Sequence, residues 1–345
     1  MTERRAGTNN VTEKIRDEIY QIKVPLPDNP LKALNSYLIT GGKRNLLIDT
    51  GFFHPVCLDT MLEGFREIEA KVSDTDIFLT HLHADHSGLA SELAGSDTKV
   101  YCSKPDGRII NLFSSEAYWD EMSDFFAKHG MPDIQEDQAQ GIHPGKLFGG
   151  RGKIKFQTVV DGDIIAAGKY HLHCICTPGH TPGHMCLFEE KEKLLFSGDH
   201  VLGDITPVIS PEKGMERPLK QYLESLERVA RLEVREILPG HRGRIAKPYE
   251  RIEALKKHHR LRLEEICNIL KQARCPVNAY EAASKMKWKM PKEIWEKVPR
   301  QQRWFATGEA IAHLLYLEEE GFAVSRINDG SIAFSLNEKG GEKIR

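Results

Sequence analysis

The sequence has little of what marks membrane proteins, secreted proteins or highly charged nucleic-acid binders. No uncharged apolar run in it approaches the roughly 18 residues that a membrane span requires. Residues 1–16 are polar and charged, without the apolar centre of a secretory signal, so we expect a flexible leader over residues 1–18. The net charge of -2 over 345 residues gives no bulk attraction to nucleic acid or to an anionic membrane.

The seven cysteines do not form the pattern of a disulfide framework. Their number is odd, and no two stand in a Cys-x-x-Cys pair, which also argues against a zinc ribbon. Cys174 and Cys176 alternate with apolar residues in a strand-like run. They could bind a soft metal, but we expect them to be small buried residues. A reducing, cytoplasmic location fits this cysteine usage best.

Three strand-like apolar runs each end in a cluster of polar residues. They are residues 77–79 before a histidine-rich loop, 193–196 before Asp199, and 234–238 before His241. A helical spacing of apolar residues lies between the last two runs. Polar clusters directly after strands are where α/β enzymes place their sites, so we predict a large α/β domain with its site at these strand ends.

Residues 106–150 show little strand pattern and contain many aromatic side chains, among them Phe113 and Trp119. We predict a helical insertion that either covers a substrate pocket or packs on the core. Two histidines, His129 and His143, lie in it. We expect surface or helix-capping positions for both rather than catalytic roles.

A second, smaller unit is expected over residues 248–345. Apolar spacing predicts a long helix at its start, Asn278 and Glu281 form a capping pair that opens another helix, and residues 301–320 form a third. A turn over residues 328–330 between two strand-like runs predicts a β-hairpin. Three helices followed by a hairpin are the pattern of a winged helix.

The densest cluster of candidate ligands lies in residues 80–88, Thr-His-Leu-His-Ala-Asp-His-Ser-Gly. Three imidazoles and one carboxylate within six residues are costly to bring together unless a divalent ion binds them. In a loop after a strand, the alternating side chains of His81 and His83 point the same way and can bind one ion. Asp85 and His86 lie beyond a bend in this loop and can face a second ion. Nitrogen and carboxylate ligands suit zinc, and iron or manganese are also compatible.

Three further candidate ligands each follow a strand-like run and sit in a glycine-containing turn: His180, Asp199 and His241. A lone Gly-His pair is weak evidence for a metal site. Three such glycine-containing turns, in this order after the histidine-rich motif, indicate a site assembled from separate loops.

With these motifs, residues 19–245 resemble the metallo-β-lactamase superfamily, and within it the glyoxalase II-like hydrolases. The resemblance implies a catalytic domain over residues 19–247, folded as an αββα sandwich with two metal ions at one edge. The first ion would be held by His81, His83 and His180. The second would be held by Asp85, His86 and His241, with Asp199 bridging both ions.

The resemblance also gives expectations for residues beside these ligands. Asp49, in Ile-Asp-Thr-Gly, matches a position that supports a ligand from behind. His184 repeats the Thr-Pro-Gly-His phrase of His180, but the family uses the earlier histidine, so we assign His184 no metal role. Asp85, Asp49 and His200 are the catalytic candidates, although His200 could equally be a packed loop histidine.

The C-terminal unit resembles the winged-helix extension of the family branch that contains β-lactamase-like protein 2, an endoribonuclease. The matching features are His-His-Arg at residues 258–260 and Ala-His-Leu at residues 312–314. The chain lacks the C-terminal basic and tyrosine pattern with which glyoxalase II grips glutathione, which argues against S-lactoylglutathione as the substrate.

The leading functional prediction is a hydrolase with two zinc ions that acts on a small acyl substrate, either a thioester or a lactone. An endoribonuclease is the alternative, since residues 251–345 carry 18 Lys and Arg against 13 Asp and Glu. A nucleic-acid-binding regulator with a metal-sensing domain would use Arg300, Arg303 and Arg326 as phosphate contacts. A C-terminal unit that only packs or forms a homodimer stays open, as does a single-iron persulfide dioxygenase.

Overall fold

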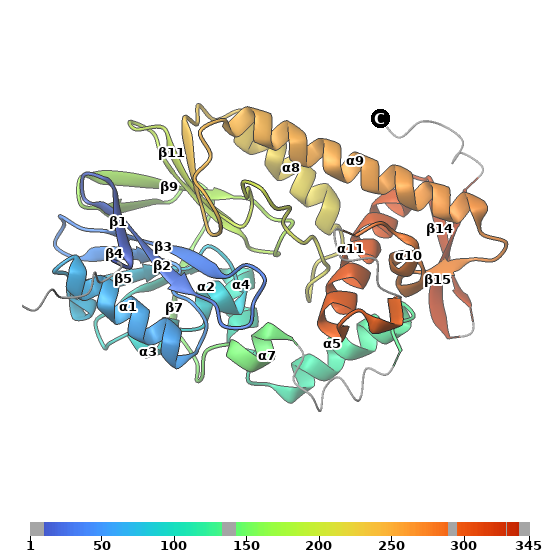
Figure 1. Ribbon diagram of the computed structural model, residues 1–345, viewed down its shortest axis with the longest axis horizontal. Coiled ribbons are helices and arrows are strands. Elements are labelled where there is room, and N and C mark those ends of the chain that lie inside the picture. Colours follow the sequence, from blue (N-terminus) through green and yellow to red (C-terminus); the bar gives the residue numbers. More distant parts are fainter. Residues whose placement is uncertain (1–9, 133–142, 289–294, 329, 338–345) are drawn as a thin grey trace, which may run out of the picture.

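The computed structural model describes residues 10–132, 143–288, 295–328 and 330–337. Two β-sheets pack face to face, helices cover their outer faces, and a group of helices with a small third sheet lies at the C-terminal end (Figure 1). This arrangement confirms the predicted mixed α/β sandwich with C-terminal helices.

The first sheet has seven strands in the order β1 to β7. Its strands from β1 to β4 are antiparallel neighbours, and those from β4 to β7 are parallel. They are β1 (Thr12–Arg16), β2 (Ile19–Pro25), β3 (Ala33–Ile39), β4 (Asn45–Ile48), β5 (Thr75–Phe78), β6 (Val100–Ser103) and β7 (Phe156–Val159).

The second sheet has five strands in the order β12-β11-β10-β9-β8. Only β11 and β12 run parallel, and the other neighbours are antiparallel. The strands are β8 (Ile164–Ala167), β9 (Tyr170–Cys176), β10 (Met185–Glu189), β11 (Leu194–Gly198) and β12 (Glu236–Pro239).

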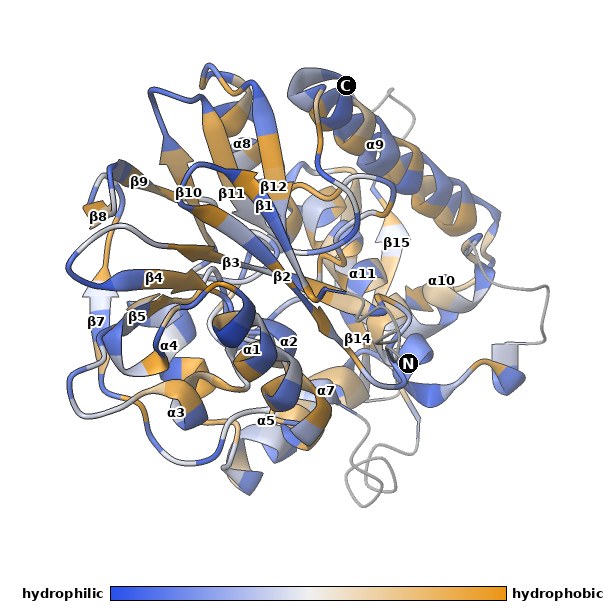
Figure 2. Cartoon of the chain, turned by 60° about the vertical axis from the view of Figure 1, so that its left-hand side comes forward, coloured by the Kyte–Doolittle hydropathy of each residue, from blue (hydrophilic) through white to orange (hydrophobic). Residues whose placement is uncertain are grey.

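Apolar side chains from both sheets fill the space between them. Tyr37 and Phe78 of the first sheet and Leu187 and Phe196 of the second belong to this buried cluster, and the rings of Tyr37 and Phe196 meet edge to face at 5.3 Å. Because successive side chains of a strand point to opposite faces, alternate residues form this core and the rest face the helices. Figure 2 shows the resulting apolar colouring along the strands.

Amphipathic helices cover the outer faces of the sandwich. The helix α1 (Pro55–Glu67) lies against β2 and buries Met61 and Phe65. On the second sheet, α8 (Pro218–Ala230) buries the apolar residues whose spacing predicted it, including Leu219 and Leu226. Shorter helices connect the strands: η1 (Val72–Asp74), α2 (Ala84–Ser87) and α3 (Ala90–Leu93).

The region between β6 and β7 is helical, as predicted. It contains α4 (Lys104–Ile110), α5 (Glu116–Lys128) and α7 (Pro144–Phe148), while residues 133–142 lie outside the described residues. His143 caps the start of α7 and accepts a hydrogen bond from the Gly145 amide at 3.1 Å, so its expected capping role is confirmed. His129 is the C-cap of α5, but it is buried rather than at the surface.

The C-terminal part consists of helices and a three-stranded sheet in the order β13-β15-β14. The predicted hairpin is present, with β14 and β15 antiparallel, although Asp329 of its turn lies outside the described residues. The capping box of Asn278 and Glu281 is also confirmed. The elements are α9 (Pro248–Gln272), β13 (Val277–Asn278), α10 (Ala279–Lys285), η2 (Trp295–Lys297), α11 (Arg300–Glu319), β14 (Ala323–Asn328) and β15 (Ser331–Leu336).

One prediction about the start of the chain is wrong. Residues 1–18 were expected to be a flexible leader, but Thr12–Arg16 form β1, which pairs with β2. Only Ile15 of this edge strand is buried, so the strand has a weak apolar signal in the sequence. Backbone pairing holds it in place, together with the carboxylate of Glu67, which accepts hydrogen bonds from the Val11 and Thr12 amides.

A search of the helices in the described residues finds none with the length and apolar character of a membrane span.

Candidate metal centre

The register of the strands brings the polar loops together at one edge of the sandwich. In the first sheet, Ile48 pairs with Phe78, so Asp49 lies beside the loop that carries the histidine motif. In the second sheet, Gly198 pairs with Pro239, so the residues that follow, Asp199 and His241, emerge side by side. Parallel neighbours end at the same edge, which explains why loops distant in sequence converge here.

A first group of possible ligands consists of His81, His83 and His180. One nitrogen of each lies within 4.8 Å of the others. Nε2 of His81 and Nδ1 of His83 lie 3.1 Å apart. The predicted first ligand set is therefore brought together in space.

A second group consists of Asp85, His86 and His241. Nε2 of His241 lies 3.2 Å from Oδ2 of Asp85 and 3.2 Å from Nε2 of His86. This group also matches the predicted set.

Asp199 lies between the two groups. Its Oδ1 is 3.4 Å from Nε2 of His86, and its Oδ2 is 3.5 Å from Nε2 of His241 and 3.9 Å from Nε2 of His180. A carboxylate whose two oxygens face both groups has the placement of a bridging ligand.

The electrostatics of the first group favour unprotonated ligands. Burial, reinforced by the neighbouring imidazoles, lowers the pKa of His81 well below its usual range. Burial and the nearby His83 lower the pKa of His180 to about 4. Burial would raise the pKa of the Asp199 carboxyl, but His241 and His86 outweigh it, and the pKa is lowered. Neutral imidazoles and an ionised carboxylate are the forms that bind a metal.

Two buried atoms test whether a metal fits this centre. Within the described part of the chain, Nε2 of His180 and Oδ1 of Asp199 have no hydrogen-bond partner. A buried polar group left unsatisfied costs about 1–3 kcal/mol. Both residues belong to the groups described above, and imidazole and carboxylate donors suit a divalent ion, so the residues present fit a bound metal.

Asp49 contacts Nδ1 of His86, the ring nitrogen that does not face the other candidate ligands, and the resemblance predicted a supporting carboxylate at this position. Its Oδ2 lies 2.7 Å from Nδ1 of His86 and accepts a hydrogen bond from the Thr80 hydroxyl at 2.8 Å. Its Oδ1 accepts a hydrogen bond from the Thr80 amide at 2.8 Å. Asp49 thus fixes the ring of His86 and the start of the histidine loop together.

Backbone carbonyls hold two other ligand rings in the same way. Nδ1 of His180 lies 2.8 Å from the Val208 carbonyl oxygen, and Nδ1 of His241 lies 2.8 Å from the Ala33 carbonyl oxygen. With Nδ1 occupied as a donor, Nε2 of each ring keeps its lone pair free for an ion.

Two further histidines lie beside the centre without joining either group of ligands. His184 is buried, and its Nε2 accepts a hydrogen bond from the Asp199 amide at 3.2 Å. The buried ring of His200 packs 5.2 Å from the ring of Tyr222, and the described residues that line the adjoining pocket do not include it. His200 therefore lies where a packed loop histidine would, rather than where a catalytic one would.

Sequence reasoning missed Asp106, a fully buried carboxylate behind the ligand loops. It accepts hydrogen bonds from the Leu82 amide at 3.0 Å, the Gly183 amide at 2.6 Å and the Thr181 hydroxyl at 2.6 Å. Burial raises its pKa to about 7, although these three donors oppose the shift. The available signal was its position three residues after Ser103, the N-cap of α4, which marks a helix start rather than a site.

A pocket of about 260 Å³ opens beside the candidate ligands. Its lining includes Asp85 and Asp199, and most of the other lining residues are apolar. The helical insertion contributes Phe113, and α11 contributes Phe305. Phe113 also belongs to the hydrophobic core with Trp119 and Phe126, so the insertion both lines the pocket and packs on the core. Among the described residues that line the pocket there is no lysine or arginine.

The chain belongs to the metallo-β-lactamase superfamily, a family of metal-dependent hydrolases, because the family model described as Metallo-beta-lactamase superfamily matches residues 31–241. This range includes all seven candidate ligands. Membership implies binding of a divalent metal, which the buried His and Asp groups fit.

Individual relatives extend the similarity beyond the matched range. A Beta-lactamase-like protein 2 homolog from Caenorhabditis elegans is 28% identical over 271 residues, covering 75% of this chain and 73% of the relative. A crystal structure of a metallo-beta-lactamase family protein from Thermus thermophilus has a TM-score of 0.78 and 29% identity, covering 94% of this chain and 100% of that chain. A beta-lactamase domain protein from Burkholderia ambifaria has a TM-score of 0.79 and 25% identity, covering 94% of this chain and 93% of that chain.

Proposed function

We propose that the protein is a hydrolase with two zinc ions at this centre. The first ion would be held by His81, His83 and His180. The second would be held by Asp85, His86 and His241, with Asp199 bridging both. The observation that carries the proposal is the position of Asp199, whose carboxylate oxygens lie 3.4–3.9 Å from histidines of both groups.

In hydrolysis, some residues of the chain would accept a proton and others would bind the substrate. When bound, two divalent ions supply a water of lowered pKa and polarise a carbonyl oxygen. The carboxylate of Asp85 lines the pocket as well as facing His241, so it is placed to accept the proton of that water. The apolar walls would orient the substrate and exclude other water.

The pocket favours an uncharged acyl substrate over RNA. A phosphodiester backbone is bound mainly through lysine and arginine, and the described lining residues include neither. The lining also includes the neutral polar side chains of Asn29, Gln301 and Gln302. We therefore propose a substrate with an apolar acyl group and neutral polar groups.

The leaving group is proposed to be a thiolate. An alkoxide leaving group usually needs a proton from a general acid, whereas a thiolate leaves without one. His143 is the histidine of the lining outside the proposed ligands, and burial lowers its pKa to about 4. At neutral pH this imidazole is not protonated and is a poor acid. A thioesterase of glyoxalase II-like type is thus preferred to a lactonase.

We also propose that residues 248–345 form a winged-helix-like unit appended to a catalytic domain over residues 19–247. The order of three helices followed by the β14–β15 hairpin supports this assignment. Its first role would be to complete the substrate pocket through α11, which supplies Gln301, Gln302 and Phe305.

A screen of the zinc-loaded protein tests the proposal. Matched acyl thioesters, oxoesters and lactones, together with β-lactams and RNA, would be offered to the wild type and to a chelator-treated sample. We expect metal-dependent cleavage of the thioester to be fastest, with two zinc ions bound per chain. RNA cleavage without thioester cleavage would establish the endoribonuclease instead, and one bound iron per chain would refute a two-zinc hydrolase.

A further inference from the structure

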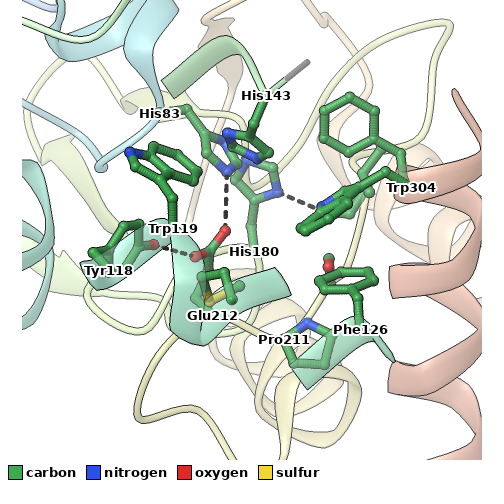
Figure 3. Close-up of a pocket in the computed structure, with 13 residues that line it drawn as sticks. His83, Tyr118, Trp119, Phe126, His143, His180, Pro211, Glu212 and Trp304 are labelled. Atoms are coloured by element: carbon green, nitrogen blue, oxygen red, sulfur yellow. Dashed lines mark hydrogen bonds and ion pairs between the residues drawn. The ribbon is translucent and has the colours of Figure 1, made fainter. Parts of the chain in front are cut away.

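A largely buried carboxylate, Glu212, faces the proposed ligand His83 (Figure 3). Its side chain is only 9% exposed and lies in the loop between β11 and α8. Oε2 accepts a hydrogen bond from the hydroxyl of Tyr118 at 3.2 Å, and Oε1 lies 3.9 Å from Nε2 of His83. A carboxylate with this little exposure is destabilising unless a donor or a cation compensates it, so its surroundings indicate its role.

The orientation of the His83 ring determines what Glu212 meets. Nδ1 of His83 faces Nε2 of His81 at 3.1 Å, which places Nδ1 on the side of the first ligand group. The ring nitrogen that remains is Nε2, and it points toward Glu212. An imidazole that binds a metal through Nδ1 carries its proton on Nε2, so the group facing the carboxylate is a hydrogen-bond donor.

The other candidate histidines each have a protein group at the nitrogen that faces away from the ions. The partners are the Thr80 hydroxyl for His81, Asp49 for His86, the Val208 carbonyl for His180 and the Ala33 carbonyl for His241. At the corresponding nitrogen of His83 the facing group is Glu212, at the longer distance of 3.9 Å. Such outer partners fix the tautomer and the orientation of a metal-binding imidazole.

We propose that Glu212 is a positioning residue that holds His83 in the Nε2-protonated tautomer and so keeps Nδ1 free for the metal. The proposal rests on the proposed two-metal site. Tyr118 holds the second oxygen of Glu212 in place, which connects the insertion helix α5 to the ligand. The surroundings strengthen this contact, because Trp119, Phe126 and Trp304 line the small cavity of about 30 Å³ into which Glu212 projects.

The test measures metal affinity rather than turnover alone. Zinc affinity would be measured by chelator competition for the wild type, Glu212→Ala, Glu212→Gln and Tyr118→Phe. We expect Glu212→Ala to weaken binding by about 10- to 100-fold, the usual effect of losing such a partner. Glu212→Gln keeps an accepting oxygen but loses the charge, so a smaller loss is expected, and Tyr118→Phe should lose least. Glu216→Gln, on the exposed end of the same loop, is the matched control and should bind as the wild type does.

A second readout separates positioning from a merely structural role. Long-range proton–nitrogen correlation on the zinc-loaded, histidine-labelled protein reports which ring nitrogen of His83 carries the proton. We expect an Nε2-bound proton in the wild type, and a shifted or lost signal in Glu212→Ala. Unchanged zinc affinity in Glu212→Ala and Glu212→Gln, or an Nδ1-bound proton on His83, would overturn the inference. If the wild type itself takes up no zinc, the proposed function fails instead, and the two failures are distinguishable.

Discussion

The ring nitrogens of the candidate ligands divide into two sets. One set faces the proposed ions, and the other meets protein groups such as Asp49 and the Val208 carbonyl. A ligand ring held at one nitrogen loses little entropy when an ion binds the other. At the scale of single residues, the centre is therefore organised before metal binding, and changes to ligands and to supporting groups should have different signatures.

Asp85→Ala should abolish hydrolysis while leaving the fold intact. Asp85 faces His241 and the pocket, and we propose that it both binds the second ion and accepts a proton. Loss of a supporting partner alone costs about 10- to 100-fold, so loss of a ligand should lower kcat/KM by more than about 100-fold. Steady-state kinetics and circular dichroism check this, with Asp97→Ala on the exposed surface as the control. Unchanged turnover would mean that the second metal group is misassigned.

Asp106→Asn should destabilise the protein although it is nearly isosteric. Both carboxylate oxygens of Asp106 accept hydrogen bonds, and the amide nitrogen of an asparagine would face a donor from Gly183 or from the pair Leu82 and Thr181. We expect a loss of about 1–3 kcal/mol in the free energy of unfolding. Urea unfolding of the two proteins at the same pH measures it. A variant as stable as the wild type would show that these contacts contribute little.

At the scale of helices and strands, the sequence allowed accurate prediction of the elements that carry the ligands. Short apolar runs located β5, β11 and β12, and an apolar spacing of 3.6 residues located α8, each to within a few residues, because their burial pattern is local. The edge strand β1 was missed, since backbone pairing rather than apolar alternation holds it.

The same contrast holds for the site. The seven candidate ligands were predicted because their motifs are dense and each follows a strand. Asp106 and Glu212 were not, because their roles depend on contacts with residues far away in sequence, such as Gly183 for Asp106 and Tyr118 for Glu212. An isolated acidic residue in the first turn of a helix, such as Asp106, or in a loop, such as Glu212, has no local pattern that distinguishes it from a solvent-exposed one.

Phe305→Ala should weaken substrate binding more than it slows the chemical step. Phe305 of α11 lines the pocket but lies outside both ligand groups. Removing part of an apolar wall lowers the binding of substrate and transition state alike, so KM should rise up to about tenfold with kcat nearly unchanged. Kinetics on thioesters of increasing acyl length measure this, with Phe322→Ala beyond the other end of α11 as the control. A fall in kcat at constant KM would place Phe305 in the chemistry instead.

At the scale of the whole molecule, the C-terminal helices and the metal centre share one loop. The residues from Asp199 to Glu212 supply the proposed bridging carboxylate, the Val208 carbonyl beside Nδ1 of His180 and the Glu212 carboxylate that faces His83. The same loop contacts the C-terminal helix α9, because Arg251 donates hydrogen bonds to the Leu202 and Ile205 carbonyls. It also contacts α8, where the hydroxyl of Tyr222 donates a hydrogen bond to the His200 carbonyl at 2.9 Å. We therefore expect the docking of α9 and the placement of Asp199 to be coupled through the backbone of this loop.

Arg251→Ala should reveal this coupling. From α9, the guanidinium of Arg251 donates hydrogen bonds to the Leu202 carbonyl at 2.5 Å and the Ile205 carbonyl at 2.6 Å. Hydrogen bonds from charged groups contribute about 1.5–3 kcal/mol each, so their loss should lower the free energy of unfolding and loosen Asp199 together. We expect weaker zinc binding in chelator competition, although Arg251 contacts neither ligand group. Arg235→Ala is the control: this exposed residue directly precedes β12, and its replacement should change neither the free energy of unfolding nor the zinc affinity. If Arg251→Ala lowers stability but keeps the zinc affinity of the wild type, the loop holds its ligands without help from the C-terminal helices.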